Sequence, residues 1–295
     1  MLRRLIIFLT VAKHLSYTRA AKELYISQPA VSKNIQELEQ ELGARLFNRR
    51  GNRIELTPAG DKAYSYGTDI HRLMQNLKYE LTEMNGSLSG TLYLGASSTI
   101  AQYLIPPVIA RFKEQNPNIN ISLLSGNTSE INSYLNNDRI DLGITEGDRR
   151  LNNFSYLPFL EDEIAFVTRP ESTISADDTL TIEELKETPL VIREAGSGTR
   201  EVFEDTLEEW DVKLADLNIV ISLGSTESIK SFVLDTDAAG VFSTHAIRRH
   251  EQKQFKVIRL QENAIKRQFS FITKQGAEHK LAESFIRFCR HSYNL

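Results

Sequence analysis

The sequence of 295 residues is poor in cysteine and has no long apolar run. Its single cysteine, Cys289, cannot form an internal disulfide, which excludes the disulfide-stapled secreted folds and fits a reducing cytoplasm. No segment approaches the roughly 18 consecutive apolar residues of a membrane span, so we expect no membrane partner. The basic start and the apolar residues after it lack the small-residue cleavage site of a signal peptide. We therefore expect a cytoplasmic protein.

The sequence patterns that mark catalysis and metal binding are also missing. Gly196 and Gly198 lack the third glycine of a dinucleotide fingerprint and the Gly-Lys-Ser/Thr of a phosphate loop. The six histidines show no tight metal-ligand spacing, and no nucleophile elbow marks a Ser-His-Asp set. Cys289 stands alone on an expected C-terminal helix, where a core position is the simpler interpretation. The sequence thus predicts no enzyme, no cofactor and no metal site.

Length and charge divide the chain into a basic head and an acidic body. A chain this long exceeds one ordinary core and predicts two or three domains. The net charge is −4, but residues 1–60 carry ten Lys and Arg against five Glu, which leaves −9 for residues 61–295. A basic head is typical of a protein that meets a polyanion. Charge alone leaves a solvated basic surface as an equal alternative.

Residues 17–42 are the most informative stretch of the sequence. They predict two short helices with a break of three or four residues between them, after a first helix over residues 2–14. The first of the two short helices spans about 18–24, and Ser16 or Thr18 can cap it. This succession is typical of a helix-turn-helix.

The second short helix has an unusually polar start. Ser27 is its expected N-cap, and Pro29 lies in the first turn, where the missing N–H costs little. The outward positions of this helix carry amides, a hydroxyl and an amine, at Gln28, Ser32, Lys33 and Gln36. Gln can bond adenine, Ser can bond base edges or phosphate, and Lys can reach guanine or phosphate. A capped surface helix without a ligand would show the same amphipathic pattern.

Residues 47–56 favour the DNA interpretation, because they predict a two-stranded wing with Gly51-Asn52 at its tip. Three arginines on so short a hairpin repel one another unless phosphates neutralise them. The residues that we expect to contact DNA are Thr18, Ser27, Gln28, Pro29, Ser32, Lys33, Gln36, Arg49, Arg50 and Arg53.

A long connecting helix follows Thr57-Pro58, an N-cap with proline at the first helical position. It ends before residues 85–90, which have the composition of a flexible joint. A narrow apolar seam runs along it at near-heptad spacing, through Ala63, Tyr66, Ile70, Leu73, Leu77 and Met84, with Leu81 close by. Such a seam predicts pairing with a second copy of the helix, with packing onto the chain's own body as the alternative.

Beyond Thr91 strands and helices alternate, which predicts parallel α/β sheets. In such folds ligands bind where strands end and helices begin. We expect strands at 91–96, 119–124, 141–145, 163–168, 189–192, 219–223, 239–243, 255–260 and 268–273. We expect helices at 100–115, 128–136, 199–212, 226–235 and 277–291.

Four strand-to-helix junctions place hydroxyls and free backbone N–H groups at a helix N-terminus. They lie at 97–99, 127–129, 196–200 and 224–226. A helix N-terminus favours a negatively charged ligand group. One such junction is only an N-cap, whereas four that converge on one cleft would form an anion site. The sequence alone does not show that they converge.

Dense motifs over residues 1–60 resemble the head of the LysR-type transcriptional regulators, and the order of the later elements fits the same family. The motifs lie at 8–12, 16–21, 27–32, 38–43, 46–49 and 56–60. The resemblance implies an α/β protein with an N-terminal all-α winged helix-turn-helix and a long linker helix. It also implies a C-terminal two-lobed domain similar to periplasmic binding proteins, and a homodimer through the linker that assembles into a homotetramer.

By this resemblance, residues 1–58 form the DNA-binding domain, 59–90 the linker helix and hinge, and 91–295 the effector-binding domain. Lobe one would comprise 91–164 and 269–295, and lobe two 165–268. The cleft between the lobes would be lined by Ser97, Ser98, Thr99, Thr128, Thr145, Glu146, Arg193, Ser197, Thr199 and Thr226.

Within the family, residues 193–200 and 224–230 look most like the branch that regulates sulfur assimilation and carbon fixation. Residues 234–240 depart from the Gly-rich, uncharged turn that relatives usually carry there, because they include Asp235 and Asp237. We expect two added carboxylates near the cleft to disfavour an anion.

These patterns together predict a DNA-binding transcriptional regulator controlled by a small, anionic effector. Its partners would be double-stranded DNA, the effector and further copies of itself, with RNA polymerase as an additional candidate. The alternative is a small-molecule binding protein or enzyme whose basic helical head serves only oligomerisation. Steeply salt-dependent promoter binding would separate the two.

Overall fold

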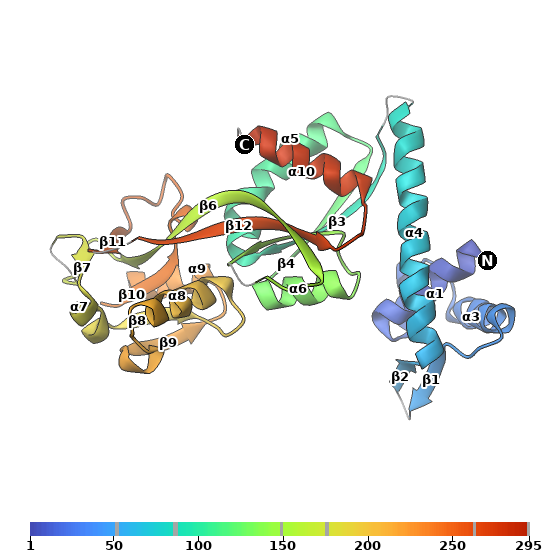
Figure 1. Cartoon of the computed structure of the whole chain (residues 1–295), viewed down its shortest axis with the longest axis horizontal. Coiled ribbons are helices and arrows are strands. Elements are labelled where there is room, and N and C mark those ends of the chain that lie inside the picture. Colours follow the sequence, from blue (N-terminus) through green and yellow to red (C-terminus); the bar gives the residue numbers. More distant parts are fainter. Residues whose placement is uncertain (51–52, 85–87, 148–149, 175–176, 262–263, 294–295) are drawn as a thin grey trace. The chain divides into compact units, whose positions relative to one another are not determined.

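The computed structural model describes residues 1–50, 53–84, 88–147, 150–174, 177–261 and 264–293. The chain forms two compact units, Met1–Ser87 and Leu88–Leu295 (Figure 1). The predicted wing tip at Gly51-Asn52 and part of the predicted hinge, 85–87, lie outside the described residues. Within the described residues, no helix combines the length and the apolar character that a bilayer crossing needs.

The first unit begins with three helices and a hairpin, which confirms the predicted winged helix-turn-helix. The elements are α1 (Leu2–His14), α2 (Tyr17–Glu23), α3 (Gln28–Leu42), β1 (Phe47–Arg50) and β2 (Arg53–Leu56). All three helices contribute buried side chains to one core, for example Phe8, Ala20 and Ile35. The wing joins this core through Phe47, whose ring centroid lies 5.4 Å from that of Phe8.

Hydroxyl side chains fix where the helices of the head begin. The Ser16 hydroxyl accepts from the Arg19 N–H at 3.3 Å, so Ser16 and not Thr18 caps α2. The Ser27 hydroxyl accepts from the Ala30 N–H at 3.3 Å, as predicted for α3. These caps satisfy N–H groups that a helix start leaves unbonded, and therefore set the turn between α2 and α3.

The linker helix α4 (Pro58–Met84) is tied to the head at its first turn. The Thr57 hydroxyl donates to the Arg45 carbonyl at 2.6 Å and accepts from the Gly60 N–H at 2.9 Å. A Cβ on Gly60 would lie 2.1 Å from the Leu46 carbonyl oxygen, so only glycine fits there. The start of α4 is therefore fixed by contacts with the backbone of residues 45 and 46.

The second unit is built on one mixed sheet in the order β4-β3-β5-β12-β6-β10-β8-β9, with β11 paired to β6 and β7. Its strands are β3 (Gly90–Ser97), β4 (Ile119–Gly126), β5 (Leu142–Glu146), β6 (Phe154–Thr168), β7 (Thr179–Leu180), β8 (Leu190–Arg193), β9 (Ile219–Leu223), β10 (Ala239–Ser243), β11 (Lys256–Leu260) and β12 (Ile265–Lys274). Its helices are η1 (Ile100–Leu104), α5 (Ile105–Gln115), α6 (Thr128–Asn136), α7 (Ile182–Glu187), α8 (Gly198–Glu209), η2 (Leu214–Asp216), α9 (Thr226–Leu234), η3 (Thr244–Ala246) and α10 (Lys280–Ser292).

Two long antiparallel strands divide this unit into lobes. Strands β6 and β12 pair along their length and run between one group of parallel strands (β4, β3, β5) and another (β8, β9) that β10 joins to β6 (Figure 1). Lobe one is the group around β3, and lobe two is the group around β8. This arrangement is the two-lobed, periplasmic-binding-protein-like fold that the resemblance implies.

The first half of β6 was not predicted, because the expected strand began only at residue 163. The register of β6 against β12 shifts between Phe269 and Ser270, and Pro158 lies opposite Ser270. A proline within a strand pattern argues against a strand unless a bulge accommodates it. The bulge provides that accommodation, and it could not be foreseen from local sequence.

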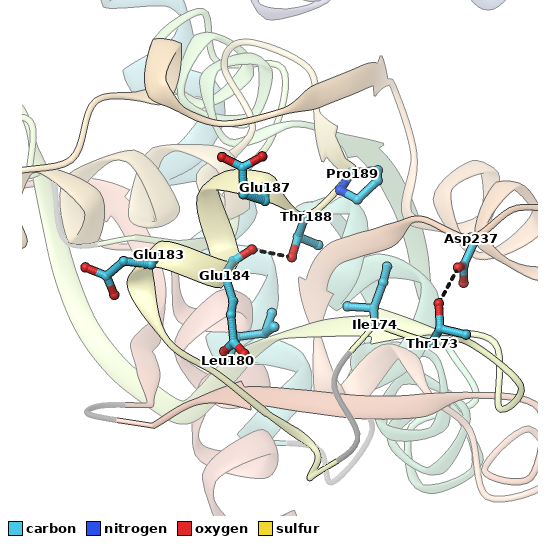
Figure 2. Close-up of a pocket in the computed structure, with 9 residues that line it drawn as sticks. All are labelled: Thr173, Ile174, Leu180, Glu183, Glu184, Glu187, Thr188, Pro189 and Asp237. Atoms are coloured by element: carbon cyan, nitrogen blue, oxygen red, sulfur yellow. Dashed lines mark hydrogen bonds between the residues drawn. The ribbon is translucent and has the colours of Figure 1, made fainter.

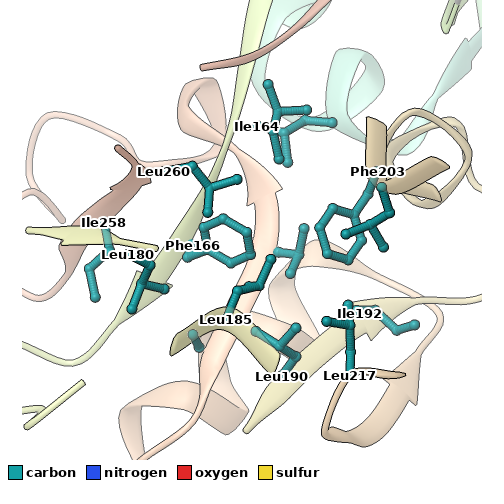
Figure 3. Close-up of a cluster of buried hydrophobic side chains, with 14 of the residues drawn as sticks. Ile164, Phe166, Leu180, Leu185, Leu190, Ile192, Phe203, Leu217, Ile258 and Leu260 are labelled. Atoms are coloured by element: carbon teal, nitrogen blue, oxygen red, sulfur yellow. The ribbon is translucent and has the colours of Figure 1, made fainter. Parts of the chain in front are cut away.

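The core of lobe two holds the elements around β8 in place. Apolar side chains from β6, β8, α7 and α8 fill it, and Figure 3 shows them converging from these elements. The rings of Phe166 and Phe203 meet edge to face at a centroid distance of 5.9 Å. Trp210, the single tryptophan, packs against the same cluster. Its fluorescence therefore reports on the integrity of lobe two.

Candidate functional site

The polar start of α3 lies on the surface of the head. Ser27, Pro29, Lys33 and Gln36 are exposed, and Thr18 on α2 is exposed as well. Gln28 and Ser32 are half-buried, and the Gln28 amide donates to the Ser32 hydroxyl at 2.8 Å. One helix face therefore presents the polar side chains that the sequence predicts to contact DNA. Strands β1 and β2 carry Arg49, Arg50 and Arg53, whose side chains lie outside the described residues.

Acidic residues on α3 are neutralised within the head. Arg4 on α1 donates to Glu37 at 2.8 Å and to Glu41 through a second short contact. These pairings turn two carboxylates toward α1. The side chains left near the polar start of α3 are neutral or basic, which suits a surface that approaches phosphates.

The predicted effector residues from both lobes meet where the strands end. Arg193, at the end of β8, donates to the hydroxyls of Ser98 at 2.9 Å and Thr226 at 3.4 Å. Ser98 follows β3 in lobe one, whereas Thr226 opens α9 in lobe two. The guanidinium thus joins two of the sequence-predicted junctions, 97–99 and 224–226. Arg193 is only 1% exposed.

The remaining predicted residues surround this centre. Thr199 donates to a carboxylate oxygen of Glu146 at 3.5 Å, and the hydroxyl of Thr128 donates to the Glu146 carbonyl at 3.4 Å. Thr128 is half-buried. Four further members are buried, namely Ser97, Thr99, Thr145 and Ser197.

The lobes touch across this region. The Ser129 N–H donates to the Gly196 carbonyl at 3.2 Å. A Cβ on Gly198 would lie within 2.7 Å of both Glu146 and Thr128, so glycine is needed for the close approach. The junctions at 127–129 and 196–200 therefore meet.

A second buried guanidinium, on Arg267, was missed by the sequence reasoning. Its Nε donates to Asp162 at 2.6 Å, its Nη1 donates to Thr199 at 2.9 Å, and its Nη2 lies 2.8 Å from a carboxylate oxygen of Glu146. The signal was strand alternation, because residues 265, 267 and 269 share one face of β12 and the outer two are apolar.

Asp162 and its neighbours complete the buried network. The Asp162 carboxylate accepts from the Ser243 hydroxyl at 2.6 Å and lies 2.9 Å from Nδ1 of His245. Burial raises the pKa of Asp162, but Arg267, His245 and Ser243 outweigh it and hold the pKa below its usual value. Asp162 therefore stays ionised beside Arg267.

The pKa of Glu146 is shifted in the opposite direction to that of Asp162. Burial is the largest influence and raises the pKa of its carboxyl, and the nearby charge of Asp162 adds to the rise. Arg267 and Arg193 oppose the rise without cancelling it. Arg267 thus lies between one carboxylate that is firmly charged, Asp162, and a second whose charge is disfavoured, Glu146.

The added carboxylates of residues 234–240 do not contact the buried guanidinium groups. Asp235 is exposed, and Asp237 accepts from Ser172 at 2.6 Å and from Thr173 at 3.0 Å. Asp237 instead lines an open cavity of about 560 Å³ beside α7, drawn in Figure 2, that shares no residue with the cleft set. Within the part of the chain that the structure describes, no direct contact therefore supports the expectation that Asp235 and Asp237 disfavour an anion in the cleft.

A winged head joined to a two-lobed unit with converging strand ends defines the class of ligand-controlled DNA-binding regulators. Residues 2–61 match the family described as bacterial regulatory helix-turn-helix protein, lysR family, and residues 85–294 match the LysR substrate binding domain. The chain belongs to the LysR family of transcriptional regulators.

Individual relatives agree with this assignment. The HTH-type transcriptional regulator CysL of Bacillus subtilis is 28% identical over 288 residues, covering 97% of this chain and 95% of CysL. A probable RuBisCO transcriptional regulator of Synechocystis is 31% identical over 291 residues, covering 97% and 84%. The regulatory domain of Synechocystis CcmR, solved in complex with 2-PG, has a TM-score of 0.63 and 23% identity over 69% of this chain and 97% of that domain. The relatives are regulators rather than enzymes, and they match the branch indicated by the resemblance.

We expect Arg267→Met to destabilise the second unit by about 3–5 kcal/mol, because the charged Asp162 would be left buried without its guanidinium partner. Urea unfolding of the full chain, followed by Trp210 fluorescence, measures the change. Arg259→Met is the matched control: Arg259 pairs with Glu163 at an exposed site, where such pairs contribute about 0–1 kcal/mol. Equal losses in both variants would contradict the assigned role of Arg267.

Proposed function

We propose that this regulator is controlled by a small anion bound between the lobes. The observation that carries the proposal is the burial of Arg193 where the ends of β3 and β8 meet the start of α9. A guanidinium presents N–H groups in a fixed fork that matches carboxylate, phosphate and sulfate. The residues around Arg193 come from both lobes. The contacts of an anion bound to Arg193 therefore depend on the angle between the two lobes.

Control of DNA binding requires the effector to prefer one arrangement of the protein over another. In the proposed division of labour, residues 1–58 contact DNA, 59–90 form the dimer and 91–295 bind the effector, with lobe one at 91–164 plus 269–295 and lobe two at 165–268. A change in lobe angle would be passed to the heads through the dimer. This function places the protein with DNA in the cytoplasm.

An anionic effector should stabilise the protein. We expect sulfate, sulfite, small carboxylates, phosphates or 2-PG to raise the Trp210-monitored melting temperature of the full chain, whereas neutral acetylserine amides do not. A ligand at 100 times its Kd stabilises by about 2.7 kcal/mol. Arg193→Met should remove the response, and Arg259→Met, which makes the same charge change on the surface, should keep it. Responses limited to uncharged compounds would rule out an anionic effector.

The head would read DNA with the polar start of α3 in the major groove. Gln28, Ser32, Lys33 and Gln36 would face base edges, while Thr18, Ser27 and Pro29 would approach the backbone. The wing arginines Arg49, Arg50 and Arg53 would neutralise phosphates. Support for the first group comes from its position on one accessible helix face.

Two substitutions separate base reading from phosphate contact. Gln28→Ala should cost about 1–3 kcal/mol at one cognate base pair and little elsewhere. Arg53→Ala should weaken binding to all DNA alike and reduce the salt slope by about 1. Fluorescence anisotropy with single-base-pair variants of the promoter at several salt concentrations measures both. Unchanged sequence preference in Gln28→Ala would show that the groove assignment is wrong.

Dimerisation through α4 is proposed from its exposed seam. The apolar side chains at heptad-like spacing are largely uncovered, with exposures of 72% for Tyr66, 61% for Leu73 and 83% for Met84. Ile70, Leu77 and Leu81 are exposed on the same helix. A seam of this kind is covered when two such helices pair. Further assembly into a homotetramer, and contact with RNA polymerase, are proposed from the family alone.

Leu77→Glu should dissociate the dimer, because a carboxylate would be buried opposite its own copy. Lys78→Glu is the matched control, since it places a carboxylate one position away on the same helix and outside the seam. Sedimentation equilibrium of the full chain measures the assembly state. If Leu77→Glu leaves assembly unchanged, the seam is not the interface.

A further inference from the structure

Arg193 already holds an anion in this structure, and that anion is part of the chain. The neighbouring residue Glu194 accepts from Nε of Arg193 at 2.8 Å and from Nη2 at 2.9 Å. This two-point contact uses the edge of the guanidinium that best recognises a carboxylate or phosphate. The opposite edge of Arg193 is occupied by the hydroxyls of Ser98 and Thr226. An external anion can reach the two-point edge only where Glu194 now lies.

Glu194 differs from the other partners of Arg193 in its accessibility. Its side chain is 29% exposed, whereas Ser98 is 7% and Thr226 is 1% exposed. The partner that can leave without disturbing the packed interior is therefore Glu194. Burial alone raises the pKa of Glu194, but Arg193 outweighs that influence and holds the pKa below its usual value, so the side chain remains a carboxylate at neutral pH.

Glu194 also links the two lobes. The Asn127 amide, at the start of α6 in lobe one, donates to the same Glu194 carboxylate at 3.4 Å. Displacement of Glu194 from Arg193 would thus alter a contact between lobes. Occupancy of the guanidinium and the relation of the lobes are coupled through this one side chain.

Two buried hydroxyls of the predicted cleft set, those of Ser97 and Ser197, make no hydrogen bond across the described parts of the chain. Both residues are at most 1% exposed. Ser197 stands at the N-cap position of α8 yet makes no capping bond. Buried hydroxyls of this kind are costly unless something bonds them. A ligand with more oxygens than a carboxylate would supply acceptors for them.

We infer that Glu194 is a built-in competitor that occupies the anion position on Arg193 and sets the affinity and selectivity for the effector. The inference rests on the proposed anionic effector. A tetrahedral oxyanion replaces the Glu194 carboxylate on Nε and Nη2 of Arg193 and offers its remaining oxygens to Ser97 and Ser197. Glu194 then turns toward solvent, and its bond to Asn127 is lost. A monocarboxylate offers no oxygens beyond the two that Glu194 already supplies.

Isothermal titration calorimetry of the full chain with inorganic phosphate, sulfate and acetate tests this inference. Glu194→Gln should bind phosphate and sulfate about tenfold more tightly than the wild type, equivalent to about 1.4 kcal/mol, because a neutral amide competes poorly for a guanidinium. Acetate should remain the weaker ligand in both proteins. Glu187→Gln, which removes an exposed carboxylate from lobe two, is the control and should match the wild type.

The outcomes separate this inference from the proposed function. A purely structural role for Glu194 predicts weaker binding on its substitution, so equal or weaker binding in Glu194→Gln, with Arg193-dependent binding in the wild type, overturns the inference and leaves the anionic effector intact. Binding by Glu194→Gln alone supports the inference, since it shows that competition is strong. Absence of phosphate and sulfate binding in both proteins contradicts the tetrahedral oxyanion and with it the inference.

Discussion

The burial of positive charge between the lobes is the constraint on which the second unit depends. Arg193 and Arg267 are almost fully removed from solvent, and neither could remain there without carboxylates and hydroxyls from several strands. Arg267 on β12 connects Asp162 on β6 with Glu146 on β5 and Thr199 on α8. The side chains that hold the lobes together are therefore also those of the proposed anion site. Stability and the proposed ligand recognition share one set of contacts.

Local signals made the head predictable. Helix spacing, the Ser27 cap and the proline in the first turn of α3 all act within a few residues, and the structure contains the helices and the wing that they predict. In the second unit, the strand-to-helix junctions predicted Ser98 and Thr226 and the family resemblance implied Arg193, and the structure brings these three together. The chemistry of Ser98 and Thr226 was visible because each lies at a junction rich in glycine or hydroxyls.

The rest of the site was hidden because it is made by pairing distant residues. Arg267 and Asp162 are separated by 105 positions, and no local pattern links them. Glu194 lies inside a motif that the sequence singled out, but its contact with its own neighbour's guanidinium depends on the bend after β8. Strand β6 shows the same limit, since its first half depends on a bulge formed with β12. Sequence indicates where a site lies more readily than which charges balance within it.

The pairing of β6 with β12 has a mechanical consequence. Because the lobes share two hydrogen-bonded strands and not flexible linkers, they can turn relative to each other only by added twist in this ribbon. Strand β5 flanks β12 from Phe269 onward and β10 flanks β6 from Ile164 onward, so only the rungs of 161–163 with 266–268 have neither neighbour. Twist between the lobes has its least resistance at these rungs. A small rotation there moves the far ends of both lobes the most.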